Sequence, residues 1–263
     1  MKRTLFYLAG LAVLLPMALL ALYALFSRWP WPDLLPSRLT LDALVSVFRG
    51  NALLVLTSSI GYSLLSALVA TLVAAPGAMA LAWHSFRGKR VVRALLLAPV
   101  LLPSTAYFVG LQAFFTRAGL GDTVLAVLLG HVIVILPYGV WTLTDVLGQM
   151  GKGLEEQART LGASGPAALW HITLPQLLPA LAAVTGLGFV ISFGQYFLTL
   201  MLGGGRVRTF AMLVVPYIQG GDRQLSAAYS LAFVAICAGV YCLFSRILQK
   251  HYREPVSMGK GAL

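Results

Sequence analysis

The sequence predicts an all-α membrane protein. Hydrophobic residues make up 59% of its 263 residues and charged residues only 10%, whereas a typical soluble domain has about 45–50% apolar and about 25% charged residues. The apolar runs are also far longer than the runs of about 4–8 residues that form buried strands. A chain of this composition and patterning crosses a membrane several times.

Six stretches are long enough to cross the membrane, because a spanning helix needs about 20 mostly apolar residues. Their ranges are 5–26, 58–83, 91–115, 123–147, 176–202 and 225–248. The middle of each is almost free of ionisable side chains, as expected where a charge at the helix centre costs about 2.5–3.5 kcal/mol. We expect one transmembrane domain covering residues 1–263.

The first stretch follows Met1-Lys2-Arg3, which is how a secretory signal also begins. Its apolar part is about 22 residues long against the usual 7–15, and no cleavage site of small residues precedes the Pro-rich segment after it. We therefore expect a retained span, with Trp29 and Trp31 at the outer interface, where amphipathic rings settle.

Two external loops have some structure of their own. Residues 27–57 form the longer one, in which Thr40 is placed to cap a short amphipathic helix. The other loop contains an apolar segment, 210–218, between two Gly-rich stretches. We expect this segment to be re-entrant or interfacial.

The distribution of basic residues predicts the orientation. Of the 19 Lys and Arg residues, 12 fall on one side of the six spans and 7 on the other, and every Lys is on the first side. Because cytoplasmic loops are enriched in Lys and Arg, both termini and the loop 153–175 are expected in the cytoplasm. We therefore attribute the net charge of +11 to residues that set the orientation in the membrane, and not to nucleic-acid binding.

The sequence offers no cluster of catalytic or metal-binding residues. Cys237 and Cys242 lie five apart in the last apolar run, which is not a same-face spacing on a helix, and we expect both to be small buried apolar residues. The four histidines are scattered, at 84, 131, 171 and 251. A membrane-embedded enzyme is therefore disfavoured, and neither a catalytic residue nor a metal ligand is assigned.

A polar, helix-forming interruption separates the fourth and fifth runs. Leu154, Ala158 and Leu161 form one apolar stripe, which we expect to face the helix bundle. Glu155 and Glu156 suit the first turn of this helix, and Arg159 lies within ion-pair reach of both.

The same segment contains signals for a turn and a second helix. Gly162 is placed to end the first helix in the left-handed conformation, and Pro166 suits the first turn of a helix over 167–171. Pro175 and Pro179 are expected to break or bend the chain as it re-enters the membrane. These features alone are also compatible with a merely solvated loop.

The order of residues in this loop resembles a known signature. Glu156-Gln157-Ala158, three residues, Gly162, nine residues and Ile172-x-Leu174-Pro175 match the EAA motif of the membrane subunits of binding-protein-dependent ABC importers at six of seven positions. The departure is Gln157, where the family has Ala; Gln is also a good helix former. The resemblance, with six spans and this loop before the last two, covers nearly the whole chain.

The resemblance implies a fold, a role and partners. The fold is that of a type I ABC importer permease, a multi-pass protein of the bacterial inner membrane. Its loop seats in a cleft on a cytoplasmic ATPase, present in two copies, which binds ATP and Mg²⁺. A second permease subunit, a paralogue, and an extracytoplasmic solute-binding protein complete the assembly. The coupling residues implied here are Glu155, Glu156, Gln157, Ala158, Arg159, Gly162, Ile172, Leu174 and Pro175.

The chain lacks a phosphate-binding loop of its own. Such a loop requires G-x-x-x-x-G-K-[ST], and the Gly-Lys pairs at 88–89, 151–152 and 259–260 lack the other residues. No cofactor is therefore expected on this chain, and the energy must come from a partner.

Five polar residues inside the spans are candidates for the substrate path: Tyr107, Gln112, His131, Gln195 and Tyr196. Hydrogen bonding across the bundle is the competing explanation for each. Gln195 and Tyr196 are favoured, because in the family the fifth span lines the path. The resemblance favours a small polar solute such as a polyamine, thiamine or iron.

Two other functions fit the sequence less well. A secondary transporter driven by an ion gradient usually has acidic or basic residues near the bilayer midplane, and the predicted spans have none there. A non-transporting membrane scaffold is compatible with the composition, but it would not need the signature loop.

Overall fold

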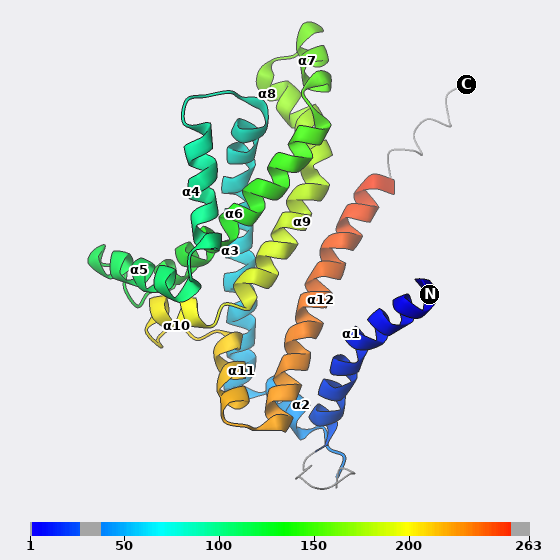
Figure 1. Cartoon of the computed structure of the whole chain (residues 1–263), viewed down its shortest axis with the longest axis vertical. Helices are drawn as coiled ribbons and strands as arrows, with labels where there is room; N and C mark the ends of the chain where they lie inside the picture. The colour runs from blue at the N-terminus through cyan, green and yellow to red at the C-terminus, as the bar shows by residue number, and fades with distance from the viewer. Residues whose placement is uncertain (1, 27–37, 254–263) are drawn as a thin grey trace. The chain divides into compact units, whose positions relative to one another are not determined.

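The computed structural model describes residues 2–26 and 38–253, and every regular element in these ranges is a helix (Figure 1). The predicted all-α fold is confirmed, while Trp29 and Trp31 lie outside the described residues. The helices are α1 (Lys2–Leu25), α2 (Asp42–Val47), α3 (Gly50–Trp83), α4 (Lys89–Leu101), α5 (Ser104–Arg117), α6 (Val124–Met150), α7 (Gly153–Thr160), α8 (Gly165–Ala168), the π-helix η1 (Leu169–Thr173), α9 (Leu174–Phe193), α10 (Phe197–Gly203), α11 (Phe210–Gln219) and α12 (Arg223–Arg253).

Among the described residues, four helices are long and apolar enough to cross a membrane. They are α3, α6, the continuous helix Gly165–Phe193 formed by α8, η1 and α9, and the part of α12 over Arg223–Arg246. The pair α4 and α5 makes a fifth if it counts as one broken span. The first expected span is α1, whose apolar part over Gly10–Leu25 is shorter than the four others. The number six stays a prediction.

The third expected span, 91–115, is not one straight helix. Helices α4 and α5 are bent by 108° at a short break. Leu102 there has an extended backbone, with φ −77° and ψ 146°, because the ring of Pro103 disfavours helical geometry in the residue before it. Hydropathy predicted the apolar stretch correctly and missed this change of direction.

The fifth expected span, 176–202, is also broken. Helix α9 ends at Phe193 and α10 begins at Phe197. Gly194 follows the end of α9, where the loss of a side chain lowers helix propensity, and the amide of Gln195 donates to the Ser192 carbonyl over 3.1 Å in a tightened last turn. The break leaves Gln195 and Tyr196 between two helices.

The chain forms two compact units, the first of which comprises residues 1–60 and 208–239. In this unit the Thr40 hydroxyl oxygen accepts from the Asp42 amide over 3.2 Å. The predicted N-cap at Thr40 is wrong, however, because Leu41 occupies the N-cap position of α2 and no side chain caps this end. The predicted apolar segment 210–218 is helix α11. Ser59 of α3 accepts from the Phe210 amide over 2.7 Å at the start of α11.

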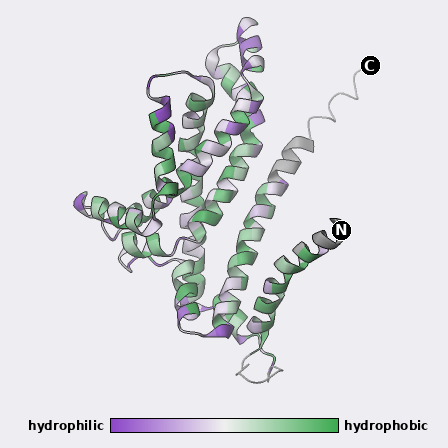
Figure 2. Ribbon diagram, in the orientation of Figure 1, coloured by the Kyte–Doolittle hydropathy of each residue, from purple (hydrophilic) through white to green (hydrophobic). Residues whose placement is uncertain are grey.

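The second unit, residues 61–207 and 240–263, contains the core that positions the polar loop. Helices α3, α6 and α9 pack closely because small residues lie between them. A Cβ atom on Gly139 of α6 would lie 3.1 Å from both the Ala74 and the Val184 side chains. Buried apolar residues of the three helices form one cluster: Ala74, Ala78, Leu81, Val140, Leu143, Leu147, Leu177 and Val184. Figure 2 shows α6 and α9 as largely hydrophobic and α7 as largely hydrophilic.

Candidate functional site

The loop between α6 and α9 is a well-defined helical turn. Helix α7 ends in a Schellman motif, in which the Gly162 amide donates to the Arg159 carbonyl and the Ala163 amide to the Ala158 carbonyl, at 3.1 and 3.0 Å. Gly162 has φ +96°, the left-handed conformation predicted for it. The loop therefore has a fixed turn and is not merely solvated chain.

The second half of the loop is continuous with the membrane helix. Ser164 caps α8, its hydroxyl accepting from the Ala167 amide over 3.4 Å, and Pro166 occupies the first turn as predicted. The expected separate helix over 167–171 is wrong, because the chain remains helical from Gly165 to Phe193. For the same reason the chain does not break at Pro175 or Pro179, which leaves a bend as the remaining alternative of the two expected there. The π-helix η1 ends two residues before Pro175 and widens the helix where the proline ring would otherwise crowd the preceding turn.

The apolar stripe of α7 does not face the bundle, contrary to the sequence prediction. Leu161 is 89% exposed and Leu154 is 56% exposed, while Ala158 is half-buried. Trp170 of η1 is exposed as well. Helix caps and the connections to α6 and α9 hold the loop in place, and the apolar stripe does not. Large apolar side chains are therefore exposed to solvent on an otherwise polar loop.

The polar residues of the loop divide into two groups. Glu156, Gln157 and Arg159 are exposed. Glu155 is half-buried and accepts a hydrogen bond of 2.8 Å from the hydroxyl of Thr173, a buried residue 18 positions away. Of the signature residues that follow, Ile172, Leu174 and Pro175 are half-buried. The Glu155–Thr173 bond joins α7 to the start of α9, so the two halves of the loop are tied together.

The base of the loop is anchored by a residue that the sequence reasoning missed. The indole Nε1 of Trp83, the last residue of α3, donates to the Leu147 carbonyl of α6 over 3.0 Å. The Lys152 Nζ lies 5.5 Å from the centroid of the same ring, within the range of a cation–π interaction. A tryptophan at the end of an apolar run was a visible signal, but its partners lie far away in the sequence.

Basic residues gather at the end of the unit that carries the loop. Lys89, Arg90 and Arg93 lie in the first turns of α4, and this end of α4 lies at the same end of the unit as α7 (Figure 1). The expected grouping of these residues with Lys152 and Arg159 is therefore seen. Which side of a membrane this end faces remains a prediction.

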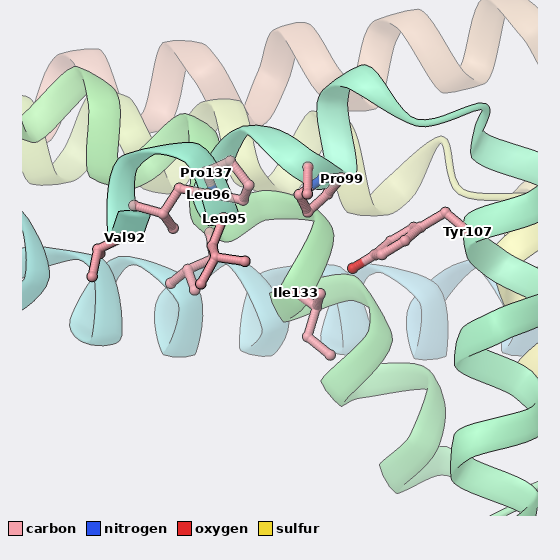
Figure 3. Close-up of a pocket in the computed structure, with 9 residues that line it drawn as sticks. Val92, Leu95, Leu96, Pro99, Tyr107, Ile133 and Pro137 are labelled. Atoms are coloured by element: carbon pink, nitrogen blue, oxygen red, sulfur yellow. The ribbon is translucent and has the colours of Figure 1, made fainter. Parts of the chain in front are cut away.

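The path candidate Tyr107 lines a pocket of about 400 Å³ between α4 and α6. Figure 3 shows its hydroxyl pointing into this pocket from α5. The other lining residues are apolar: Val92, Leu95, Leu96, Ala98, Pro99, Ile133, Leu136 and Pro137. The pocket lies beside the break between α4 and α5, and the phenol is its one polar side chain.

The remaining path candidates do not line this pocket. Gln112, Gln195 and Tyr196 are half-buried. His131 is buried, and its ring bonds to Ser192 and Thr199. Thr199 in turn donates to the Gln195 carbonyl over 2.5 Å. The structure thus brings His131 and Gln195 into one network at the break between α9 and α10, and it leaves Tyr107 apart from them.

Within the described residues, no group of three or more His, Cys, Asp or Glu side chains is placed to hold a metal ion. Fold and loop together define a helical membrane protein with one structured polar loop that is continuous with a spanning helix.

Comparison with known proteins agrees with this class. Residues 74–254 match the family of binding-protein-dependent transport system inner membrane components. The chain is 26% identical over 238 residues to a putative 2-aminoethylphosphonate transport system permease protein, PhnV, of Salmonella typhi, covering 90% of each. It is 32% identical over 189 residues to the molybdenum transport system permease protein ModB of Mycobacterium bovis, covering 66% of this chain and 71% of ModB.

Two further matches cover different shares of the chain. A probable sulfate transport system permease protein, cysT, of Marchantia polymorpha is 34% identical over 158 residues, and the match covers 54% of this chain and 55% of that protein. A bacterial ABC transporter involved in the import of the acidic polysaccharide alginate has a solved chain with a TM-score of 0.71 and 18% identity, covering 93% of this chain and 94% of that one. The structural likeness concerns the fold.

The chain belongs to the family of binding-protein-dependent transport system inner membrane components, and it is a permease subunit of an ABC importer. Importers of this kind work with an ATPase and a binding protein. The resemblance read from the EAA-like loop is thereby confirmed.

Proposed function

We propose that the loop 153–175 is the surface through which a cytoplasmic ATPase drives this permease. The observation that supports it most directly is the continuous helix Gly165–Phe193. Because α8, η1 and α9 form one rod, displacement of the exposed loop reaches the interior of the membrane domain instead of being absorbed at a hinge. The Glu155–Thr173 bond makes α7 part of the same rigid piece.

The exposed residues of the loop suit a partner surface. Leu154, Leu161 and Trp170 offer apolar area, and Glu156 and Arg159 beside them offer charge-assisted hydrogen bonds. Large exposed apolar side chains rimmed by polar ones are typical of a docking site. Glu155 is assigned a different role from the one expected of it: it holds the loop together rather than meeting the ATPase.

The remaining features of the assembly are also proposed. Two ATPase copies bind ATP and Mg²⁺, and two permease subunits, this chain and a paralogue, form the path. Both termini and the loop lie in the cytoplasm, in agreement with the basic residues gathered at the loop end of the unit. Tyr107, Gln112, Gln195 and Tyr196 are the proposed path residues; Tyr107 has the most direct support, because its hydroxyl points into a pocket.

For the substrate we propose a small oxyanion. Matched permeases are named for sulfate, molybdenum and 2-aminoethylphosphonate, and one is named for trehalose. None of these names refers to a polyamine, thiamine or iron. The proposed path offers neutral donors, two phenols and two amides, which can bind an anion without a fixed counter-charge. A polyamine cation would be better served by carboxylates, which these positions lack.

The coupling role is tested in proteoliposomes that contain the complete importer. Glu156→Lys reverses an exposed charge on α7, and we expect it to lower both ATP-dependent uptake and the amount of ATPase that co-purifies. Arg90→Glu, a reversal of an exposed charge outside the loop, is the matched control and should leave co-purification unchanged. Full uptake and full co-purification with Glu156→Lys would overturn the proposal.

The substrate class is tested separately by uptake with labelled sulfate, molybdate, 2-aminoethylphosphonate, putrescine, thiamine and ferric iron. Accumulation of one of the first three supports an oxyanion carrier. Accumulation of putrescine, thiamine or iron alone would contradict it and restore the substrates favoured by the sequence.

A further inference from the structure

One buried imidazole bridges the two sides of the break between α9 and α10. The Nδ1 atom of His131, on α6, lies 2.7 Å from the hydroxyl oxygen of Ser192 in the last turn of α9. Its Nε2 atom lies 3.0 Å from the hydroxyl oxygen of Thr199 in the first turn of α10. All three side chains are buried. A single ring therefore contacts the end of one helix and the start of the next.

The hydrogen-bond partners fix the direction of this network. The Thr199 hydroxyl lies 2.5 Å from the Gln195 carbonyl, and a carbonyl only accepts, so the threonine proton lies in that bond. The Thr199 oxygen must then accept from Nε2–H of His131. None of the bonded partners is charged, and a buried charge without a partner is costly. The ring is therefore assigned as neutral, with Nδ1 accepting from the Ser192 hydroxyl.

The network lies where the rod from the loop ends. The helix Gly165–Phe193 runs from the loop to the break, and beyond it α10 packs against α5 and α6 through Leu198 and Leu202, which belong to a buried cluster with Val127. The backbone of residues 194–196 also joins the two helices across the break. That backbone carries Gln195 and Tyr196, two of the proposed path residues.

We propose that His131 is a positioning residue: from α6 it holds the end of α9 and the start of α10 together, so that α10, with Gln195 and Tyr196, follows α9 when the loop is displaced. This inference rests on the proposed function, because it needs a displacement that begins at α7. It differs from the role in substrate contact considered from the sequence. Both ring nitrogens are engaged within the protein and the ring is buried, so it has no free donor for a solute.

The proposal is tested by the distance between two nitroxide labels. The labels replace Leu187, an exposed residue of α9, and Met201, a half-buried residue of α10. Cys237 and Cys242, the two cysteines of the sequence, are first changed to alanine. The complete importer is measured in lipid nanodiscs, without nucleotide and with bound ATP. We expect a narrow distance distribution that is the same in both states.

The informative variants keep or remove one hydroxyl. Thr199→Val retains the shape of the side chain without its hydroxyl, and it should broaden the distribution without nucleotide and make it change with ATP. Thr199→Ser keeps the hydroxyl and should restore the narrow distribution. Ser192→Ala removes the other bond and should also broaden it, so the test does not depend on a single variant.

Two results would overturn the proposal: a narrow, unchanged distribution in both Thr199→Val and Ser192→Ala, or equal broadening by Thr199→Ser and Thr199→Val. The second would show that packing, rather than the hydrogen bond, holds the break. ATP hydrolysis measured on the same samples tests the proposed function independently. A broader distance distribution without nucleotide reports on the break between α9 and α10 itself, even if the complex does not hydrolyse ATP.

Discussion

A single glycine determines how α7 ends. Gly162 has φ +96°, and a Cβ atom at this position would meet no atom within 4 Å. A side chain would therefore not clash here. The constraint is the left-handed backbone, whose strain costs a residue with a Cβ about 1–2 kcal/mol. We expect Gly162→Ala to destabilise the Schellman turn by about that amount, which corresponds to a roughly 5–30-fold faster exchange of the amides that close it.

Hydrogen exchange of the Gly162 and Ala163 amides measures this effect. Gly165→Ala is a matched control, because Gly165 also has open space around it and its φ is not positive. Gly162→Asn should lie between the two, since asparagine tolerates the left-handed region. Equal exchange in Gly162→Ala and Gly165→Ala would show that the turn is not what limits opening of the loop.

The bond between Thr173 and Glu155 gives a second prediction. A hydrogen bond to a charged group contributes about 1.5–3 kcal/mol, and this one joins α7 to the start of α9. Thr173→Val should loosen α7 from the rod, so that more ATP is hydrolysed for each solute molecule imported. Thr173→Ser, which keeps the donor, should retain the wild-type ratio. If Thr173→Val leaves the number of ATP molecules hydrolysed per imported solute unchanged, the bond has no part in coupling.

Some residues of the site could be read from the sequence, and others could not. Gly162 and Pro166 were predictable because their roles depend on local backbone chemistry within a few positions. The bonds of His131 were not, since its partners lie 61 and 68 positions away. The same holds for Trp83 and Leu147, which are 64 positions apart. Such pairs become neighbours only when the helices pack.

Helices were predicted more reliably than their interruptions. The stretch 123–147 corresponds to α6, Val124–Met150, because a long apolar run with few ionisable residues has only one stable form in a membrane. The breaks after α4 and α9 depend on backbone preferences at Leu102, Pro103 and Gly194, which hydropathy does not report. Prolines alone were also misleading, since Pro175 and Pro179 lie within a continuous helix while Pro103 begins a new one.

The packing of α9 against α3 and α6 gives a prediction with a matched pair of glycines. A Cβ atom on Gly188 would lie 2.9 Å from the Ile135 Cγ2 and 3.2 Å from the Ala67 Cβ, whereas one on Gly186 would meet nothing within 4 Å. Both positions are helical, so alanine gains about 1 kcal/mol of helix propensity at each. Gly186→Ala should therefore be neutral or stabilising, and Gly188→Ala destabilising by about 1–3 kcal/mol through overpacking.

Thermal unfolding of the purified permease in detergent distinguishes the two variants. Both variants add one methyl group to the same helix and are compared in the same detergent, so a difference between them reports the local packing. A higher melting temperature for Gly188→Ala than for Gly186→Ala would mean that the three helices can separate at this point without cost. The close approach of α3, α6 and α9 would then not be a constraint on the sequence.

The orientation of the chain in the membrane is the last prediction. The 12-to-7 distribution of Lys and Arg places the loop 153–175 in the cytoplasm, and the turn after α5 is expected outside. Leu161 is 89% exposed in the loop, and Ala118 is exposed just after α5. With Cys237 and Cys242 replaced by alanine, a cysteine at 118 should react with a membrane-impermeant maleimide in cells whose outer membrane has been permeabilised. In cells that express the permease without the ATPase proposed to cover this residue, a cysteine at 161 should react only after the inner membrane is also opened. The reverse pattern would invert the assignment and place the loop out of reach of a cytoplasmic ATPase.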